Sequence, residues 1–228
     1  MGDLKEDLAG PEIELVETHI SWVFLGQNSV FKIKKPVDFG FLDFTTLEKR
    51  EVACLAEVRL NARLAPEVYE GTVPVTLDGD GRHRLGGDGE IVDWAVKMVR
   101  LPDAERADIL LERGRLTDRA IDELAKHLAR FHEGMPTSDA ISEFARPDAL
   151  LGNIRQNFAQ TRDTVHSHLS SREATEIETK QIAFVERRRD LFEARVRAGR
   201  VRDGHGDLRL EHVYLSEDHP PTVIDCIE

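Results

Sequence analysis

Residues 202–215, RDGHGDLRLEHVYL, say most about the fold, and TVID follows them at 222–225. Two glycines flank His205, and Asp207 comes directly after the second of them. Glycine allows tight loops that other residues resist, so this stretch predicts a loop that presents a carboxylate. The apolar residues on either side are typical of short strands. We therefore expect a strand–loop–strand unit that carries two carboxylates, Asp207 and Asp225.

These two carboxylates suit the transfer of a phosphoryl group from ATP. That reaction needs a group that accepts the proton of the substrate hydroxyl, a ligand for a metal ion, and a lysine on the phosphates. Asp207, in a glycine-flanked loop, fits the first role. Asp225, at the end of an apolar strand, fits the second, because Mg²⁺ prefers hard oxygen ligands.

The order HGD, four residues, H and then VID resembles the catalytic and metal loops of the aminoglycoside phosphotransferase group, within the protein-kinase-like superfamily. LAKHLARFHEG (124–134) is similar to the helix that precedes the catalytic loop in that group, and WAVKMVRLP (94–102) to its interlobe strand and hinge. Residues 18–69 resemble the N-lobe of a bacterial branch that is often fused to a C-terminal P-loop kinase domain. The resemblance covers nearly the whole chain.

The resemblance implies an α+β, protein-kinase-like fold of two lobes. Residues 1–101 would form a small N-lobe, an antiparallel sheet with one helix, and residues 102–228 a mainly helical C-lobe. The implied reaction is transfer of the γ-phosphoryl group of ATP to a hydroxyl of a small molecule, with Mg²⁺ as the metal. The adenine would lie against the hinge at 98–101, which contains Met98 and Arg100.

The resemblance also implies roles for individual residues. Asp207 would be the catalytic base or would orient the substrate, His205 would hold the loop, and Asp225 would bind Mg²⁺. The second metal-ligand position, normally asparagine, is His212 here. Imidazole is a softer donor than an amide oxygen, so we expect either an altered metal site that accepts Mn²⁺ more readily or a lower activity.

The phosphate-binding lysine belongs to the strand at 30–34. Val30, Lys32 and Lys34 share one face of it, because side chains alternate along a strand. Kinases carry a small apolar residue two positions before this lysine, which favours Lys32, with Lys34 second. Its partner should be a glutamate of the next helix, Glu57 or alternatively Glu51. The chain has no G-x-G-x-x-G before the hairpin, so a phosphate-covering loop would lie near 17–19.

Local patterns predict the remaining elements. A hairpin turns at 26–28, and a polar turn at 78–90 joins the strands at 72–77 and 91–99. Helices are expected near 104–113, 117–134, 148–166 and 171–198, the last with a capping box of Ser170 and Glu173. A further helix, capped by Thr45 or Thr46, should run through Leu64. Its apolar face would consist of Leu47, Val52, Leu55, Val58 and Leu64.

Composition excludes several classes of partner. The chain has 31 Lys and Arg against 43 Asp and Glu among 228 residues, a net charge of −12. Such a surface repels nucleic acids and anionic membranes. Only 2 cysteines are present, which indicates a reducing compartment. The first residues are charged without an apolar core, and no stretch reaches 18 apolar residues, so we expect a cytoplasmic protein without a membrane span.

Two other functions remain open. His212 favours a pseudokinase that binds nucleotide and regulates an attached domain, and His205, Asp207 and His212 allow a metal-dependent hydrolase. The acceptor substrate is not identified by the sequence. Asp225 lies close to the last residue, and the helices near 117–133 and 171–198 would lack their usual cover. We therefore expect a piece of a longer protein, with more C-lobe helices and a P-loop kinase domain as partner.

Overall fold

The computed structural model describes residues 3–40 and 42–227, and their fold is α+β, as predicted. The described residues form two compact units, one that reaches Leu128 and resumes at His205, and one from Ala129 to Gly204. The lobe boundary expected after Leu101 stays a prediction. No helix of the described residues is both long enough and apolar enough to cross a bilayer.

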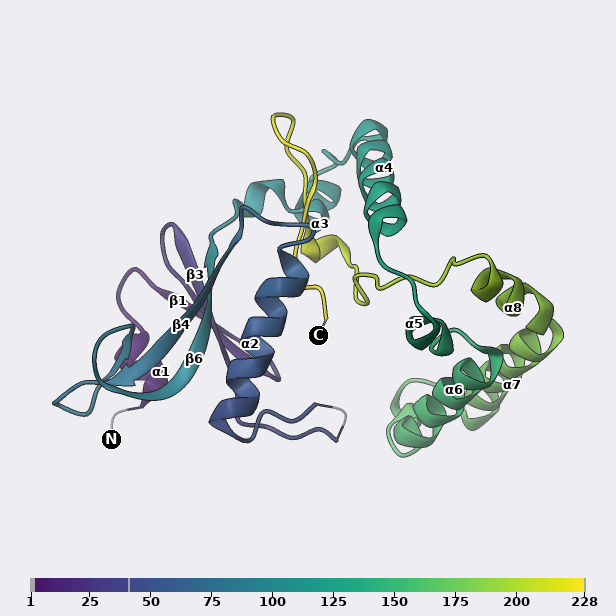
Figure 1. Ribbon diagram of the computed structural model, residues 1–228, viewed down its shortest axis with the longest axis horizontal. Coiled ribbons are helices and arrows are strands. Elements are labelled where there is room, and N and C mark those ends of the chain that lie inside the picture. Colours follow the sequence, from purple (N-terminus) through teal and green to yellow (C-terminus); the bar gives the residue numbers. More distant parts are fainter. Residues whose placement is uncertain (1–2, 41, 228) are drawn as a thin grey trace. The chain divides into compact units, whose positions relative to one another are not determined.

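The first unit is built on an antiparallel sheet, which has six strands among the described residues, in the order β1-β2-β3-β6-β4-β5 (Figure 1). The hairpin between β2 and β3 is confirmed, and the N–H of Gly26 donates to the carbonyl of Ser29 across its turn. The turn expected at 78–90 contains an additional short strand, β5. The strands are β1 (Glu14–Glu17), β2 (Ser21–Leu25), β3 (Ser29–Lys34), β4 (Tyr69–Leu77), β5 (His83–Leu85) and β6 (Glu90–Val99).

Helices α1 (Leu4–Leu8) and α2 (Leu47–Asn61) pack against apolar clusters on opposite faces of this sheet. Alternation along β3 puts Phe31 and Ile33 in the cluster with α1, and Val30 in the cluster with α2. Lys32 and Lys34 are therefore directed toward α2. The cluster on the α2 face includes Val30, Cys54, Val68, Tyr69, Val96 and Met98, and the other includes Leu8, Phe24, Ile33, Val75 and Ala95.

The N-terminus of α2 agrees with the sequence, and of the predicted apolar face Val58 and Leu64 do lie inside, but two other residues do not. Thr46 is the N-cap and accepts a hydrogen bond from the N–H of Lys49. Val52 and Leu55, expected inside, are 66% and 51% exposed. The buried positions are Arg50, Ala53, Cys54, Glu57, Leu60 and Asn61. The helix turns polar residues inward because partners in other elements pair with them, and it ends at Asn61, before Leu64.

The end of the chain belongs to the first unit and forms two short strands after the glycine-flanked loop, whereas residues 200–209 contain no strand, so the strand expected before that loop is wrong. Strands β7 (Val213–Tyr214) and β8 (Thr222–Val223) pair in antiparallel fashion. The N–H of Leu215 donates to the carbonyl of Glu105, which attaches this hairpin to the segment after β6. The accompanying helices are the 3₁₀ turns η1 (Asp103–Glu105) and η3 (Leu210–His212) and helix α3 (Ala107–Glu112).

Helix α4 (Asp118–Gly134) begins in the first unit, capped by Thr117 as predicted, and continues into the second. The capping box of Ser170 and Glu173 is confirmed. The single helix expected at 171–198 is wrong, because the chain leaves helical geometry at Arg188, with φ −116° and ψ 25°. The other helices of this unit are α5 (Asp139–Glu143), α6 (Pro147–Thr161), η2 (Val165–Ser167), α7 (Ser171–Arg187) and α8 (Arg189–Arg197).

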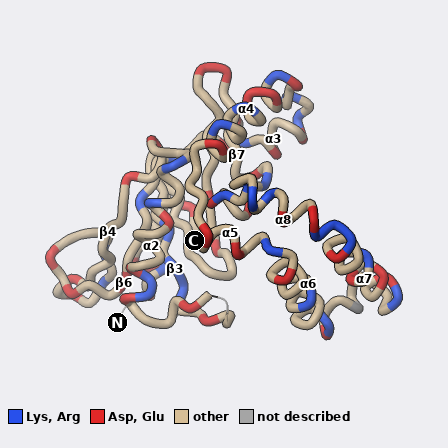
Figure 2. The backbone as a smooth tube through the Cα atoms, turned by 45° about the vertical axis from the view of Figure 1, so that its right-hand side comes forward, with Lys and Arg blue, Asp and Glu red and all other residues tan. Residues whose placement is uncertain are grey.

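The charges of α7 and α8 agree with a solvated surface. Figure 2 shows acidic and basic residues interspersed along both helices, so the basic residues do not form a continuous stripe. Many of these charges make local pairs, such as Lys180 with Glu176 and Arg197 with Glu193. Exposed pairs of this kind contribute little to stability.

Removal of the Asp93 carboxylate should destabilise the first unit strongly. Arg50 on α2 donates through Nε to Asp93 on β6 at 2.8 Å, and both side chains are buried. Asp93→Ala leaves the guanidinium buried without its counter-ion, which we expect to cost about 3–5 kcal/mol of unfolding free energy. Urea denaturation measures this loss. Asp122→Ala on the exposed side of α4 is the matched control, and equal losses in the two variants would contradict the role of the ion pair.

Candidate active site

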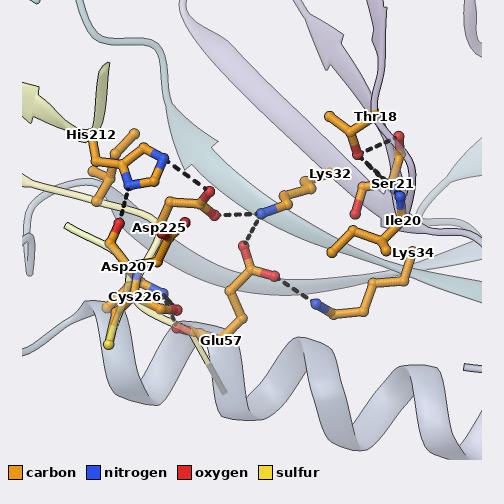
Figure 3. Close-up of polar contacts among 12 residues, drawn as sticks. Thr18, Ile20, Ser21, Lys32, Lys34, Glu57, Asp207, His212, Asp225 and Cys226 are labelled. Carbon is orange, nitrogen blue, oxygen red and sulfur yellow. Dashed lines mark hydrogen bonds and ion pairs between the residues drawn. The ribbon is translucent and has the colours of Figure 1, made fainter. Parts of the chain in front are cut away.

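The centre of the site is a group of paired charges between β3, α2 and the segment that follows β8. Nζ of Lys32 lies 2.7 Å from Oδ1 of Asp225 and 3.0 Å from Oε1 of Glu57 (Figure 3). Nζ of Lys34 lies 2.9 Å from Oε2 of the same glutamate. Of the two glutamates considered from the sequence, Glu57 is therefore the one that contacts both lysines. All four charged residues belong to the first unit.

The two lysines have different surroundings. The Lys34 side chain is 2% exposed, and its ammonium also lies 4.8 Å from the centre of the Phe44 ring. The Lys32 side chain is 16% exposed and lines a cavity. Lys34 thus holds Glu57 from the inside, while Lys32 is able to reach a ligand. This arrangement agrees with the choice of Lys32 as the phosphate lysine.

Mutual attraction keeps these groups charged. Burial alone lowers the pKa of Lys32, but the carboxylates of Glu57 and Asp225 outweigh burial and raise the pKa above its ordinary value. Burial alone raises the pKa of Glu57, but Lys32 and Lys34 outweigh it and lower the pKa. The pKa of Asp225 is lowered in the same way, mainly by Lys32 against the effect of burial. The site therefore holds two ammonium groups and two carboxylates.

Helix α2 also fixes the backbone around Asp225. Asp225 has a φ of +64°, in the left-handed region that non-glycine residues seldom adopt. Its N–H donates to the hydroxyl of Tyr69 at 3.2 Å. The N–H of Cys226 donates to Oδ1 of Asn61 at 2.7 Å, and Nδ2 of Asn61 donates to the carbonyls of Cys226 and Glu57. Asn61 was not predicted from the sequence as part of the site, although it follows Glu57 by four residues and the two therefore share one helix face.

His205 holds the glycine-flanked loop in place. Its Nε2 donates to the carbonyl of Ile224 at 2.9 Å, and its Nδ1 accepts from the N–H of Asp207. Burial lowers the pKa of His205, so the ring is neutral at physiological pH. Gly206 has a φ of +88°, and a Cβ at this position would overlap the side chain of Ile227. This geometry fits the structural role expected for His205 and explains the glycine after it.

Asp207, His212 and Asp225 lie together. Nδ1 of His212 donates to the carbonyl of Asp207 at 2.8 Å, and its Nε2 lies 3.6 Å from Oδ2 of Asp225. The Asp207 carboxylate is half exposed and lies 3.4 Å from Nε of Arg209. A carboxylate in this position can accept a proton from a ligand hydroxyl. Arg209 was not predicted from the sequence as a site residue. The one signal for it in the sequence is its position two residues after Asp207.

A cavity of about 220 Å³ in the first unit joins the charged residues to the predicted hinge. Lys32, His212 and Asp225 line its polar part, and Met98 and Arg100 also line it. Thr18 is a further lining residue, which agrees with the phosphate-covering loop expected near 17–19. The apolar lining residues include Val23, Leu25, Val30, Val68, Leu101 and Ile224. The cavity thus combines an apolar wall with fixed charges, as many ligand sites do.

Asp225 suits a hard divalent cation that is shared with a ligand. No group of three or more His, Cys, Asp and Glu side chains converges on a metal position among the described residues. Mg²⁺ at phosphate sites takes only one or two carboxylates from the protein, and phosphate oxygens and water complete its coordination. Oδ1 of Asp225 faces Lys32, whereas Oδ2 lies on the side of His212. Asp225 therefore fits as one ligand of such an ion.

No family model matches this chain. It is similar to an uncharacterized protein of Mycobacterium bovis and to an uncharacterized protein of Mycobacterium tuberculosis. Each is 34% identical over 218 residues, which is 96% of this chain and 42% of the relative. The chain thus spans about two fifths of the length of the curated relatives that it matches.

Glu57→Gln should change how stability depends on pH. The pKa of Glu57 is lower in the folded protein than its ordinary value of 4.5, so its stabilising effect exists above that value and is lost as the pH falls through the folded pKa. The variant should unfold more easily at pH 7, by about 3–5 kcal/mol, because Lys34 keeps its burial without its counter-ion.

Urea denaturation between about pH 3 and pH 7 tests this expectation, because stability is linked to proton uptake. The wild type should lose more stability than Glu57→Gln as the pH falls below 4.5. Glu112→Gln on the exposed side of α3 is the control and should follow the wild type. Parallel curves for wild type and Glu57→Gln would contradict the assigned ion pairs.

Proposed function

We propose that this chain carries an ATP-dependent phosphotransferase that moves the γ-phosphoryl group to a hydroxyl of a small molecule. Residues 1–101 would serve as the N-lobe of a kinase-like arrangement and residues 102–228 as its C-lobe. The observation that supports this most is the cavity that Lys32 and Asp225 line together with Met98 and Arg100. These four residues are far apart in the sequence, each was predicted from the sequence to bind ATP or its metal ion, and all four line one cavity.

The ion pairs of Lys32 and Lys34 leave Lys32 able to bind a triphosphate. Lys32 contacts two carboxylates, and exchange of Asp225 for a phosphate oxygen would leave its pair with Glu57 intact. Lys34 holds the other oxygen of Glu57, so the glutamate keeps its orientation when Lys32 turns to the ligand. The adenine would occupy the apolar part of the cavity beside Met98. Such preorganisation lowers the cost of reorganising charges during the reaction.

The transfer itself requires one proton acceptor and one leaving group. The carboxylate of Asp207 takes the proton of the substrate hydroxyl, and the hydroxyl oxygen forms a bond to the γ-phosphorus. The bond between this phosphorus and the β–γ bridging oxygen breaks, and ADP leaves with the electron pair. Asp225 would hold Mg²⁺, which neutralises charge on the β- and γ-phosphates when bound. The products are a phosphate monoester, ADP and a proton.

A nucleotide-binding module with little activity is the second candidate. Its support is His212, which stands where an amide oxygen is usual and whose Nε2 already accepts from Arg209 at 3.1 Å. A metal-dependent hydrolase has less support. Both ring nitrogens of His205 make hydrogen bonds that hold the loop, so this histidine is not oriented as a metal ligand. A P-loop kinase domain as partner stays a prediction.

MgATP should raise the melting temperature of the protein, because a ligand that binds only the folded state stabilises it. The gain would be about 2.7 kcal/mol at a concentration 100 times the dissociation constant. Lys32→Met should reduce the shift, compared with the same variant without nucleotide. Lys97→Met, which alters an ion pair with Glu70 on the same sheet, is the control and should keep the shift. An unchanged wild-type melting curve at millimolar MgATP would contradict the proposal.

Asp207→Asn should abolish turnover and leave nucleotide binding intact, because its carboxylate acts on the acceptor. Loss of a general base typically lowers the rate by about 10²–10⁴-fold. Release of ADP with a panel of hydroxylated metabolites measures the rate, and melting with MgATP measures binding. Asp218→Asn in the exposed segment between β7 and β8 is the control. Full turnover by Asp207→Asn would show that another group accepts the proton.

A further inference from the structure

Arg209 contacts two residues of the site, but the proposed reaction gives it no role. Its Nη2 lies 3.1 Å from Nε2 of His212, and its Nε lies 3.4 Å from Oδ2 of Asp207. Its Nη1 lies 2.6 Å from Oε1 of Glu211. These three contacts orient the side chain. Because it is 56% exposed, it is also accessible to a ligand.

The contacts of His212 define what Arg209 meets. The carbonyl of Asp207 can only accept a hydrogen bond, so Nδ1 of His212 carries the proton. Nε2 then presents a lone pair, and this lone pair accepts from the Arg209 guanidinium. It is the same nitrogen that lies 3.6 Å from Asp225 and would have to bind a second metal ion.

A guanidinium and a second metal ion exclude one another at this point. Each carries positive charge, and each needs the lone pair of Nε2. Arginine cannot lose its proton in a protein, and its planar fork binds phosphate oxygens in pairs. Positive charge around the transferring phosphoryl group stabilises the transition state, whether metal ions or arginine side chains provide it.

We propose that Arg209 takes the place of a second divalent cation, so that nucleotide binds with one such ion, at Asp225, and the guanidinium contacts the γ-phosphoryl group. This inference rests on the proposed phosphotransferase function. Lys32 would then act on one side of Asp225. Arg209, held by its hydrogen bond to His212, would act on the other side. At position 212 the imidazole gives the guanidinium a nitrogen acceptor, and it gives a metal ion a softer donor than an amide oxygen would.

The number of bound metal ions tests this inference without any measurement of activity. A non-hydrolysable ATP analogue is added below the protein concentration, so that all of it binds, and Mn²⁺ is titrated while free Mn²⁺ is followed by electron paramagnetic resonance. The same titration without the analogue is subtracted. The wild type should bind one Mn²⁺ per analogue, and two in the wild type would overturn the inference.

Variants show whether Arg209 causes this number. Arg209→Ala frees Nε2 and should raise the count from one to two, whereas Arg209→Lys, which keeps the charge, should leave it at one. His212→Asn replaces Nε2 with an amide oxygen, a harder donor for a divalent cation, so it should also give two. Arg119→Ala at the exposed start of α4 is the control for lost charge and should give one.

The outcomes separate this inference from the proposed function. A count that stays at one in both Arg209→Ala and His212→Asn overturns the role of Arg209 and leaves the phosphotransferase intact. A wild type that binds no analogue at all overturns both. With ATP and an acceptor, Arg209→Ala should be at least tenfold slower than wild type at low Mn²⁺, and recovery at high Mn²⁺ should follow occupancy of its second site.

Discussion

Two ion pairs to the carboxylate of Glu57, one from Lys32 and one from Lys34, hold β3 against α2 and thereby support the whole site. A buried charge costs several kcal/mol unless an opposite charge meets it at close range. Glu57 is 2% exposed and receives Lys34 on one oxygen and Lys32 on the other. A shift of β3 by one residue would move both lysines to the opposite face of the sheet. The ion pairs with Glu57 therefore require that this face of β3 is turned toward α2.

The end of the chain depends on the same helix. Asn61, one turn after Glu57, bonds to both backbone groups of Cys226, and Lys32 pairs with Asp225 directly before it. Lys32 and Asn61, which contact Glu57, thus also hold Asp225 and Cys226 in place. The left-handed conformation of Asp225 persists because Tyr69 and Asn61 hold the peptide groups on both sides of it.

His205 and His212 show how one residue type takes different roles in the structure. Their rings lie 6.0 Å apart and nearly parallel, at 26°. His205 uses both nitrogens within the loop and toward Ile224, so nothing remains for a ligand. His212 uses one nitrogen on Asp207 and turns the other toward Arg209 and Asp225. Lys32 and His212 both line the cavity, and Arg209 contacts His212.

Several local features follow from the amino-acid sequence alone: the hairpin at Gly26, the cap at Thr46, the capping box at Ser170 and the glycine-flanked loop around His205. Each depends on neighbouring residues, which the sequence states directly. Three other features depend on long-range contacts: the pairing of Glu57 and not Glu51 with the lysines, the burial of Arg50 and Asn61 in place of Val52 and Leu55, and the contact between Arg209 and His212. The physical reason is that a polar side chain is buried only where a partner compensates for lost water, and here the partners lie on β3, on β6 and beyond β8.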